Sequence, residues 1–87
     1  MVRQDNSETP RQGGLTFEDA KRWCVPFGSH RGKTIAEVGL SDSGLLWLEY
    51  SEEMYYTQGL YREALRVFLN DARIRKRIEE IRLRREH

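Results

Sequence analysis

The last third of the chain carries a helical repeat of apolar residues that restricts the fold more than any other feature. From residue 60 onward, apolar residues recur at intervals of three and four, which predicts an amphipathic helix. The apolar stripe is broad at first and later narrows to Ile74, Ile78 and Ile81. A single helix over residues 60–84 would be about 38 Å long, which exceeds the width of so small a domain.

The sequence allows two arrangements of this helix. In the first, residues 71–87 continue it beyond the domain as a basic helical extension. The narrow isoleucine seam would then form an interface with a second copy of the chain or with a phage or host protein. In the second arrangement the helix breaks at Asn70-Asp71, and the Asp71 side chain caps the helix that follows.

The N-terminal part divides into a tail and the start of the domain. Residues 1–14 are polar and contain no apolar run, so we expect a flexible tail and neither a signal peptide nor a membrane anchor. The folded domain is expected over residues 15–70. Thr16 stands three residues before Asp19, as in a capping box, and this spacing predicts a helix over residues 17–23.

Two glycines bracket a short polar loop in the middle of the domain. Residues with β-branched and aromatic side chains flank Gly28 and Gly32 on the outside. This pattern predicts a small β-hairpin or a pair of extended arms. Thr34 offers an alternative, because its side chain can cap a short helical turn over residues 35–38.

An apolar helix is predicted after this loop. Capping residues precede a run of leucines around Trp47, so a helix over residues 43–50 is expected near the centre of the core. Together with the other elements, this helix predicts a small single domain of the α+β class. Its short β-hairpin would pack with two or three helices, of which the long C-terminal amphipathic helix is one.

Length and composition limit the function. The 87 residues are 38% hydrophobic and 33% charged, which suffices for one small core but not for a deep ligand pocket as well. Cys24 is the only cysteine, and neither histidine stands at a metal-ligand spacing. We therefore expect no catalytic residues, metal, cofactor or small-molecule substrate. A cytoplasmic location without a membrane span is also expected.

Charge is segregated along the chain, although the net charge is only +1. Residues 34–60 hold five acidic residues and no Lys or Arg, whereas residues 61–87 hold nine Lys or Arg against five acidic residues. Such segregation indicates either contact with nucleic acid or an acidic protein, or a solvated helix face laced with salt bridges.

The glycine-bracketed loop is the candidate surface for nucleic acid. Glycines allow close approach to the backbone, and neighbouring cations can contact phosphates. The loop ends in Gly-Lys-Thr, but three residues separate its glycines where a nucleotide-binding loop needs four, so a nucleotide site is not expected. The predicted contact residues are Lys21, Arg22, Gly28, His30, Arg31, Gly32 and Lys33.

Each of these features also has a purely structural interpretation. The glycines can simply shape the turn while the cations stay solvated. Four aromatic residues offer faces for stacking on bases, although their spacings are more typical of a core: Trp23, Phe27, Trp47 and Tyr50.

Two sequence blocks carry a family resemblance. The first is PFGSHRGKT at residues 26–34, and the second is GLLWLEY at residues 44–50. They resemble the small domain found at the C-terminal end of exonuclease X-like proteins and as free-standing proteins, many of them from bacteriophages. The family's first block reads PFGKHKGKT, so Ser29 replaces a Lys, and in the second block the two aromatic positions are exchanged. The likeness covers about residues 17–68.

The resemblance implies an accessory module that travels with DNA-processing and recombination proteins, and not a nuclease. The resulting expectation is a non-catalytic nucleic-acid-binding module of phage origin, acting on DNA rather than RNA in the cytoplasm of a bacterial host. The alternative is a protein interaction module that forms a homodimer, or binds a host or phage partner, through the C-terminal helix.

Overall fold

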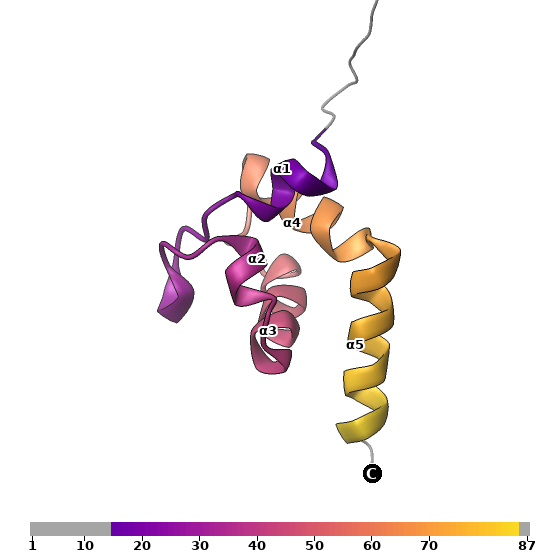
Figure 1. Cartoon of the computed structure of the whole chain (residues 1–87). Helices are drawn as coiled ribbons and strands as arrows, with labels where there is room; N and C mark the ends of the chain where they lie inside the picture. Colours follow the sequence, from indigo (N-terminus) through magenta and orange to yellow (C-terminus); the bar gives the residue numbers. More distant parts are fainter. Residues whose placement is uncertain (1–14, 86–87) are drawn as a thin grey trace, which may run out of the picture.

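The computed structural model describes residues 15–85, and the predicted tail over residues 1–14 lies outside this range. Within it the chain forms five α-helices and one 3-10 turn, with no strand or sheet. The predicted α+β class is therefore wrong, and the fold is all-helical (Figure 1). The elements are α1 Phe17–Lys21, the 3-10 turn Gly28–His30, α2 Ile35–Val38, α3 Asp42–Glu52, α4 Gly59–Asn70 and α5 Ala72–Arg85.

Capping side chains fix where the first two helices begin. Thr16 accepts a hydrogen bond from the amide of Asp19, and the Asp19 carboxylate accepts one from the amide of Thr16. Thr34 and Glu37 form the same reciprocal pair at the start of α2. Both boxes satisfy helix amides that would otherwise lack partners. The predicted capping box at Thr16 and the alternative of a Thr34-capped turn are thus confirmed.

The predicted β-hairpin is replaced by two short arms. The arms share a single antiparallel bridge, between Cys24 and Thr34. The amide of Val25 donates to the carbonyl of Lys33 (2.8 Å), and the amide of Ile35 donates to the carbonyl of Trp23 (2.8 Å). No strand develops further because α2 begins immediately after Thr34 and takes the second arm out of the extended conformation.

The C-terminal helical pattern is interrupted at Asp71, as the second arrangement predicted. Asp71 has an extended backbone (φ −63°, ψ 136°) and ends α4. Its carboxylate accepts a hydrogen bond from the amide of Arg73 (2.9 Å) and so caps α5. The hydrogen bonds and charge of Arg73 lower the pKa of Asp71. The break lets α5 pack against α3 and α4.

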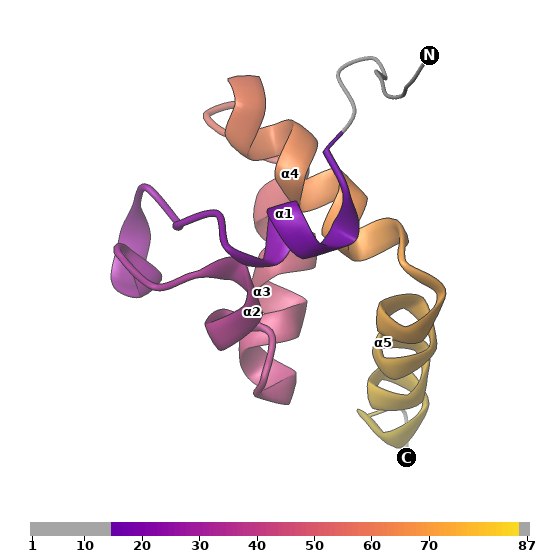
Figure 2. The same cartoon turned by 45° about the horizontal axis from the view of Figure 1, so that its top comes forward.

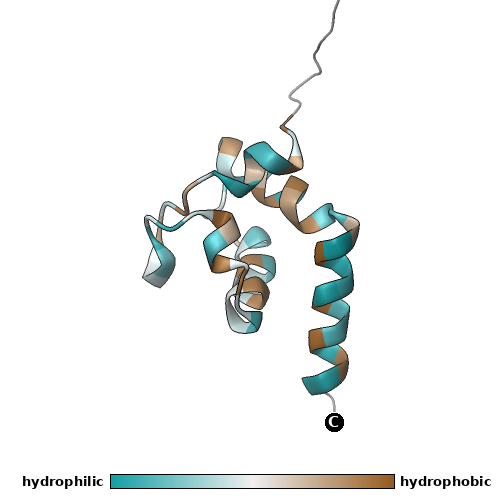
Figure 3. Cartoon of the chain, viewed as in Figure 1, coloured by the Kyte–Doolittle hydropathy of each residue, from teal (hydrophilic) through white to brown (hydrophobic). Residues whose placement is uncertain are grey.

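Helix α5 completes the core of the domain. Ile74, Ile78 and Ile81 are at most 7% exposed, and the apolar residues of α5 lie mostly on its side toward α3 (Figure 3). The predicted partner interface on these isoleucines is therefore corrected, because the chain's own helices cover them. The core consists of Ala20, Val25, Ile35, Val38, Leu45, Leu48, Tyr61, Ala64, Leu65, Phe68, Leu69, Ile74, Ile78 and Ile81.

None of the helices within residues 15–85 has the length and apolar character needed to cross a membrane.

Candidate nucleic-acid interface

The predicted contact surface is a loop that stands away from the helices. It joins α1 to α2 and lies on the opposite side of the molecule from α5 in both views (Figure 1 and Figure 2). Gly28 and Gly32 have positive φ angles of 77° and 89°, which side chains other than glycine rarely adopt. The two glycines thus make the loop, and the prediction that they shape a turn is confirmed.

The side chain of Trp47, from α3, packs against the loop. A Cβ atom on Gly28 would lie 3.2 Å from the indole ring, so the glycine backbone packs directly on Trp47. The ring of His30 meets the same indole edge-on, with centroids 4.7 Å apart, and Phe27 lies 6.1 Å from it. Side chains from the two blocks of the family resemblance are therefore in direct contact, which fixes the position of the loop on the core.

Three cations of this region are exposed and have no partner among residues 15–85. Arg22 lies at the base of the first arm, whereas Arg31 and Lys33 lie in the loop itself. None of the three forms an ion pair or a side-chain hydrogen bond with any carboxylate or carbonyl of the described part. The loop therefore presents its positive charge to solvent, where it is free to meet an anion.

The two remaining predicted contact residues, Lys21 and His30, have partners within the described part of the chain. Lys21 forms an ion pair with Glu18 (3.1 Å), and its ammonium lies 5.4 Å from the centre of the Phe17 ring. It is thus tied to its own helix and not joined to the loop. His30 is half-buried against Trp47. Of the seven predicted residues, the structure gathers five in the loop, places Arg22 beside it and leaves Lys21 apart.

The C-terminal cations have mostly intramolecular partners. Arg66 and Arg62 pair with Glu52. Arg82 pairs with Glu49, while Arg77 and Arg84 share Asp42. The acidic segment therefore faces the basic one, as the salt-bridge interpretation predicted. Three exposed cations of α5 form no ion pair within residues 15–85: Arg75, Lys76 and Arg85.

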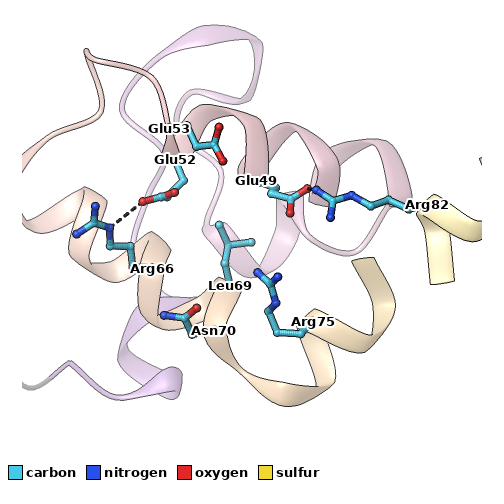
Figure 4. Close-up of a pocket in the computed structure, with 8 residues that line it drawn as sticks. All are labelled: Glu49, Glu52, Glu53, Arg66, Leu69, Asn70, Arg75 and Arg82. Carbon is cyan, nitrogen blue, oxygen red and sulfur yellow. Dashed lines mark hydrogen bonds and ion pairs between the residues drawn. The ribbon is translucent and has the colours of Figure 1, made fainter. Parts of the chain in front are cut away.

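A cleft of about 460 Å³ lies within this ion-pair network (Figure 4). Glu49 and Glu52 of α3, with Glu53 directly after the helix, line one side. Arg66 of α4 and Arg75 and Arg82 of α5 line the other. Opposite charges balance across the cleft. No group of three His, Cys, Asp or Glu side chains in the described range could hold a metal ion. The cleft thus has the character of a solvated seam between helices.

Two tyrosines near the loop were not singled out from the sequence. Tyr55 is 85% exposed and Tyr56 is 47% exposed, both in the connection between α3 and α4. Tyr56 meets Phe27 edge-on, with centroids 5.0 Å apart. Of the four aromatic residues that the sequence offers for stacking, Trp23, Phe27 and Trp47 are partly buried against the core, and Tyr50 is exposed. The sequence signal that could have indicated an aromatic surface here is the adjacent pair Tyr55-Tyr56.

Tyr61 is the buried tyrosine that packs against this aromatic group. Its ring packs edge-on against Phe27 (5.6 Å), and its buried hydroxyl has no well-formed hydrogen bond within the described residues. Burial raises the pKa of Tyr61 to about 12, and a weak interaction with Ser51 opposes this only in part. The hydroxyl therefore stays protonated at neutral pH.

Comparisons of the chain with protein-family models, with curated proteins and with solved structures found no match. The family resemblance thus depends on the two sequence blocks alone.

Proposed function

We propose that the chain is a non-catalytic nucleic-acid-binding module that contacts phosphates through the loop between α1 and α2. The observation that carries the proposal is a set of exposed cations, in this loop and at its base, that have no partner among residues 15–85: Arg22, Arg31 and Lys33. Their counterparts at the C-terminal end of the chain mostly have carboxylate partners within the molecule. Charge that is not neutralised internally is available for an external anion.

The shape of the loop suits a phosphate backbone. A Cβ atom on Gly32 would meet nothing within 4 Å, so the main chain is accessible at this position. A phosphate can approach the glycine backbone while Arg31 and Lys33 contact its oxygens. Such contacts neutralise charge and release counterions without reading the bases, so binding would be independent of sequence and sensitive to salt.

The proposal keeps the role implied by the family resemblance. It describes an accessory module for DNA processing or recombination, encoded by a phage and acting in the cytoplasm of its bacterial host. The alternative of an interaction module on the isoleucine seam loses its support, because Ile74, Ile78 and Ile81 are covered by the chain's own helices.

The test compares two double variants of equal charge. Arg31→Ala with Lys33→Ala removes two unpaired cations of the loop, whereas Arg82→Ala with Arg84→Ala removes two cations that pair with Glu49 and Asp42. Affinity for a fluorescein-labelled DNA duplex is measured by anisotropy over a range of salt concentrations. The slope of log affinity against log salt is negative, and its magnitude should fall by about 2 for the loop variant, at roughly 0.9 per lost phosphate contact.

The control variant should change this slope by less than half as much. An equal fall in both variants would show that only net charge matters and would remove the loop from the proposal. Absence of binding by the unmodified chain at low salt would end the proposal altogether. Circular dichroism of each variant confirms that the helices are retained.

A further inference from the structure

A continuous row of aromatic rings runs from the cationic loop to the connection between α3 and α4. His30 contacts Trp47 (4.7 Å), Trp47 contacts Phe27 (6.1 Å), and Phe27 contacts Tyr56 (5.0 Å). Tyr56 in turn contacts Tyr55 at 5.4 Å between ring centroids. We call these five residues the aromatic row. It begins within the loop and ends at the most exposed tyrosine described above.

The outer end of the row is poorly explained by core packing. Tyr55 and Tyr56 are 85% and 47% exposed, although burying large aromatic rings is normally favourable. Tyr61 already fills the space beneath Phe27. The row thus extends beyond the core while its inner end is fixed to it.

The geometry of the row leaves ring surface free. Every contact in it is tilted or edge-to-face, with interplanar angles between 59° and 90°. In contrast, Phe17 and Phe68 stack in parallel within the domain, at 6°. An edge-to-face contact covers the edge of one ring and one face of the other, so the pair keeps ring faces on which another planar group can stack. The row therefore connects exposed tyrosine rings to the loop that carries Arg31 and Lys33. Ring faces together with cations are what a nucleotide with an accessible base requires.

We propose that this surface binds single-stranded nucleic acid in preference to duplex, with phosphates on the loop cations and one or two bases stacked on Tyr55 and Tyr56. The inference rests on the proposed function and specifies its ligand. In a duplex the bases are stacked on each other and their faces are covered, so the tyrosines gain nothing from it. In a single strand each base has a free face, and stacking is tolerant of sequence.

The experiment uses the full chain with three labelled probes of equal length: an oligo-dT strand, a fully abasic strand and a DNA duplex. The abasic strand keeps the phosphates but has no bases. The unmodified chain should bind oligo-dT most tightly. Tyr55→Ser should lower affinity for oligo-dT by roughly 5- to 150-fold, the range for one lost stacking contact, and should leave the abasic strand and duplex unaffected.

Tyr50→Ser is the matched control. Tyr50 is a tyrosine of α3 that is 62% exposed and makes no ring contact with the row among the described residues. Both substitutions are at exposed side chains, so both variants should keep their fold, as circular dichroism can verify. The control should not change the affinity for any of the three probes.

The outcomes separate the two proposals. Equal binding of all three probes, or no effect of Tyr55→Ser on oligo-dT, overturns the single-strand inference and leaves phosphate contact by the loop intact. An equal effect of Tyr50→Ser also overturns it, because exposure and not the row would then be responsible. If no probe binds at low salt, the proposed function fails and the inference fails with it.

Discussion

The loop between α1 and α2 and the helix α5 are both rich in cations, but they use them in opposite ways. In the loop, Arg31 and Lys33 extend into solvent without partners in the described chain. On α5, Arg82 and Arg84 pair with Glu49 and Asp42 of α3. Arg77 also pairs with Asp42 (3.6 Å) and donates a hydrogen bond to the carbonyl of Gly39 (2.7 Å), which connects α5 to the end of α2.

The difference shows that a count of basic residues is a poor guide to a binding surface. The C-terminal segment is the more basic of the two in sequence, yet much of its charge is matched by the acidic segment that precedes it. Exposed pairs of this kind stabilise a fold only slightly, by about 0–1 kcal/mol each. Their main effect here is to reduce the charge that α5 offers to a partner, so the smaller cationic region becomes the better candidate.

The largest expected effect tests whether α5 belongs to the folded core. Ile78 is 1% exposed, so Ile78→Ala should lower the free energy of unfolding by roughly 2–5 kcal/mol. Arg31→Ala in the loop should change it by no more than about 0.5 kcal/mol. Urea unfolding followed by circular dichroism measures both values. A small loss for Ile78→Ala would mean that α5 is an appendage, and the contrast between the two regions would collapse.

A smaller effect is expected from the glycines of the loop. Gly28→Ala and Gly32→Ala both place a side chain at a positive φ angle, at a cost of roughly 1–2 kcal/mol. Only Gly28→Ala also pushes against Trp47, so it should be the more destabilising of the two and should weaken nucleic-acid binding more. Thermal unfolding and anisotropy give the comparison. Equal losses in both variants would show that contact with Trp47 does not hold the loop in place.

The smallest effect at neutral pH concerns Tyr61, beneath the aromatic row. Tyr61→Phe removes a buried hydroxyl that has no well-formed hydrogen bond among residues 15–85, so stability at pH 7 should stay within about 1 kcal/mol or rise. The unfolded chain loses the tyrosine proton near pH 10, whereas the folded chain keeps it up to about pH 12. Because the folded chain binds this proton more tightly than the unfolded chain, the protonated tyrosine contributes its full stability below pH 10. This contribution is lost as the pH rises toward 12.

Tyr61→Phe has no hydroxyl proton to lose, so this variant should not show this part of the loss of stability at alkaline pH. Urea unfolding at neutral pH and over the alkaline range measures it, with Tyr55→Phe as the control because that ring is exposed in the folded chain. Identical alkaline behaviour of Tyr61→Phe and the unmodified chain would contradict the buried placement of the hydroxyl.

Local signals in the sequence predicted local structure well. The capping spacing at Thr16 and the helix break at Asn70-Asp71 depend on residues within a few positions of each other, and both are found in the structure. The hairpin prediction failed for a related reason. Glycines and β-branched residues indicated a turn between two arms, but Thr34 and Glu37 formed a capping box that directed the second arm into a helix.

The features that decide the candidate site depend on contacts that are distant in sequence. The pairing of Arg84 with Asp42 spans 42 residues, and no local pattern indicates that it forms. The meeting of Phe27 with Tyr56 likewise requires the α3–α4 connection to return to the loop. The sequence therefore identified the cationic loop, but it could not show which of its cations lack partners within residues 15–85 or which aromatic rings adjoin the loop.

The bridge between Cys24 and Thr34 has a practical consequence. Cys24 is the only cysteine of the chain, it is exposed, and it lies at the base of the loop. A thiol-reactive dye would therefore attach at one defined position beside the cations without any engineering. The natural sequence thus supplies its own fluorescent reporter position for ligand arrival.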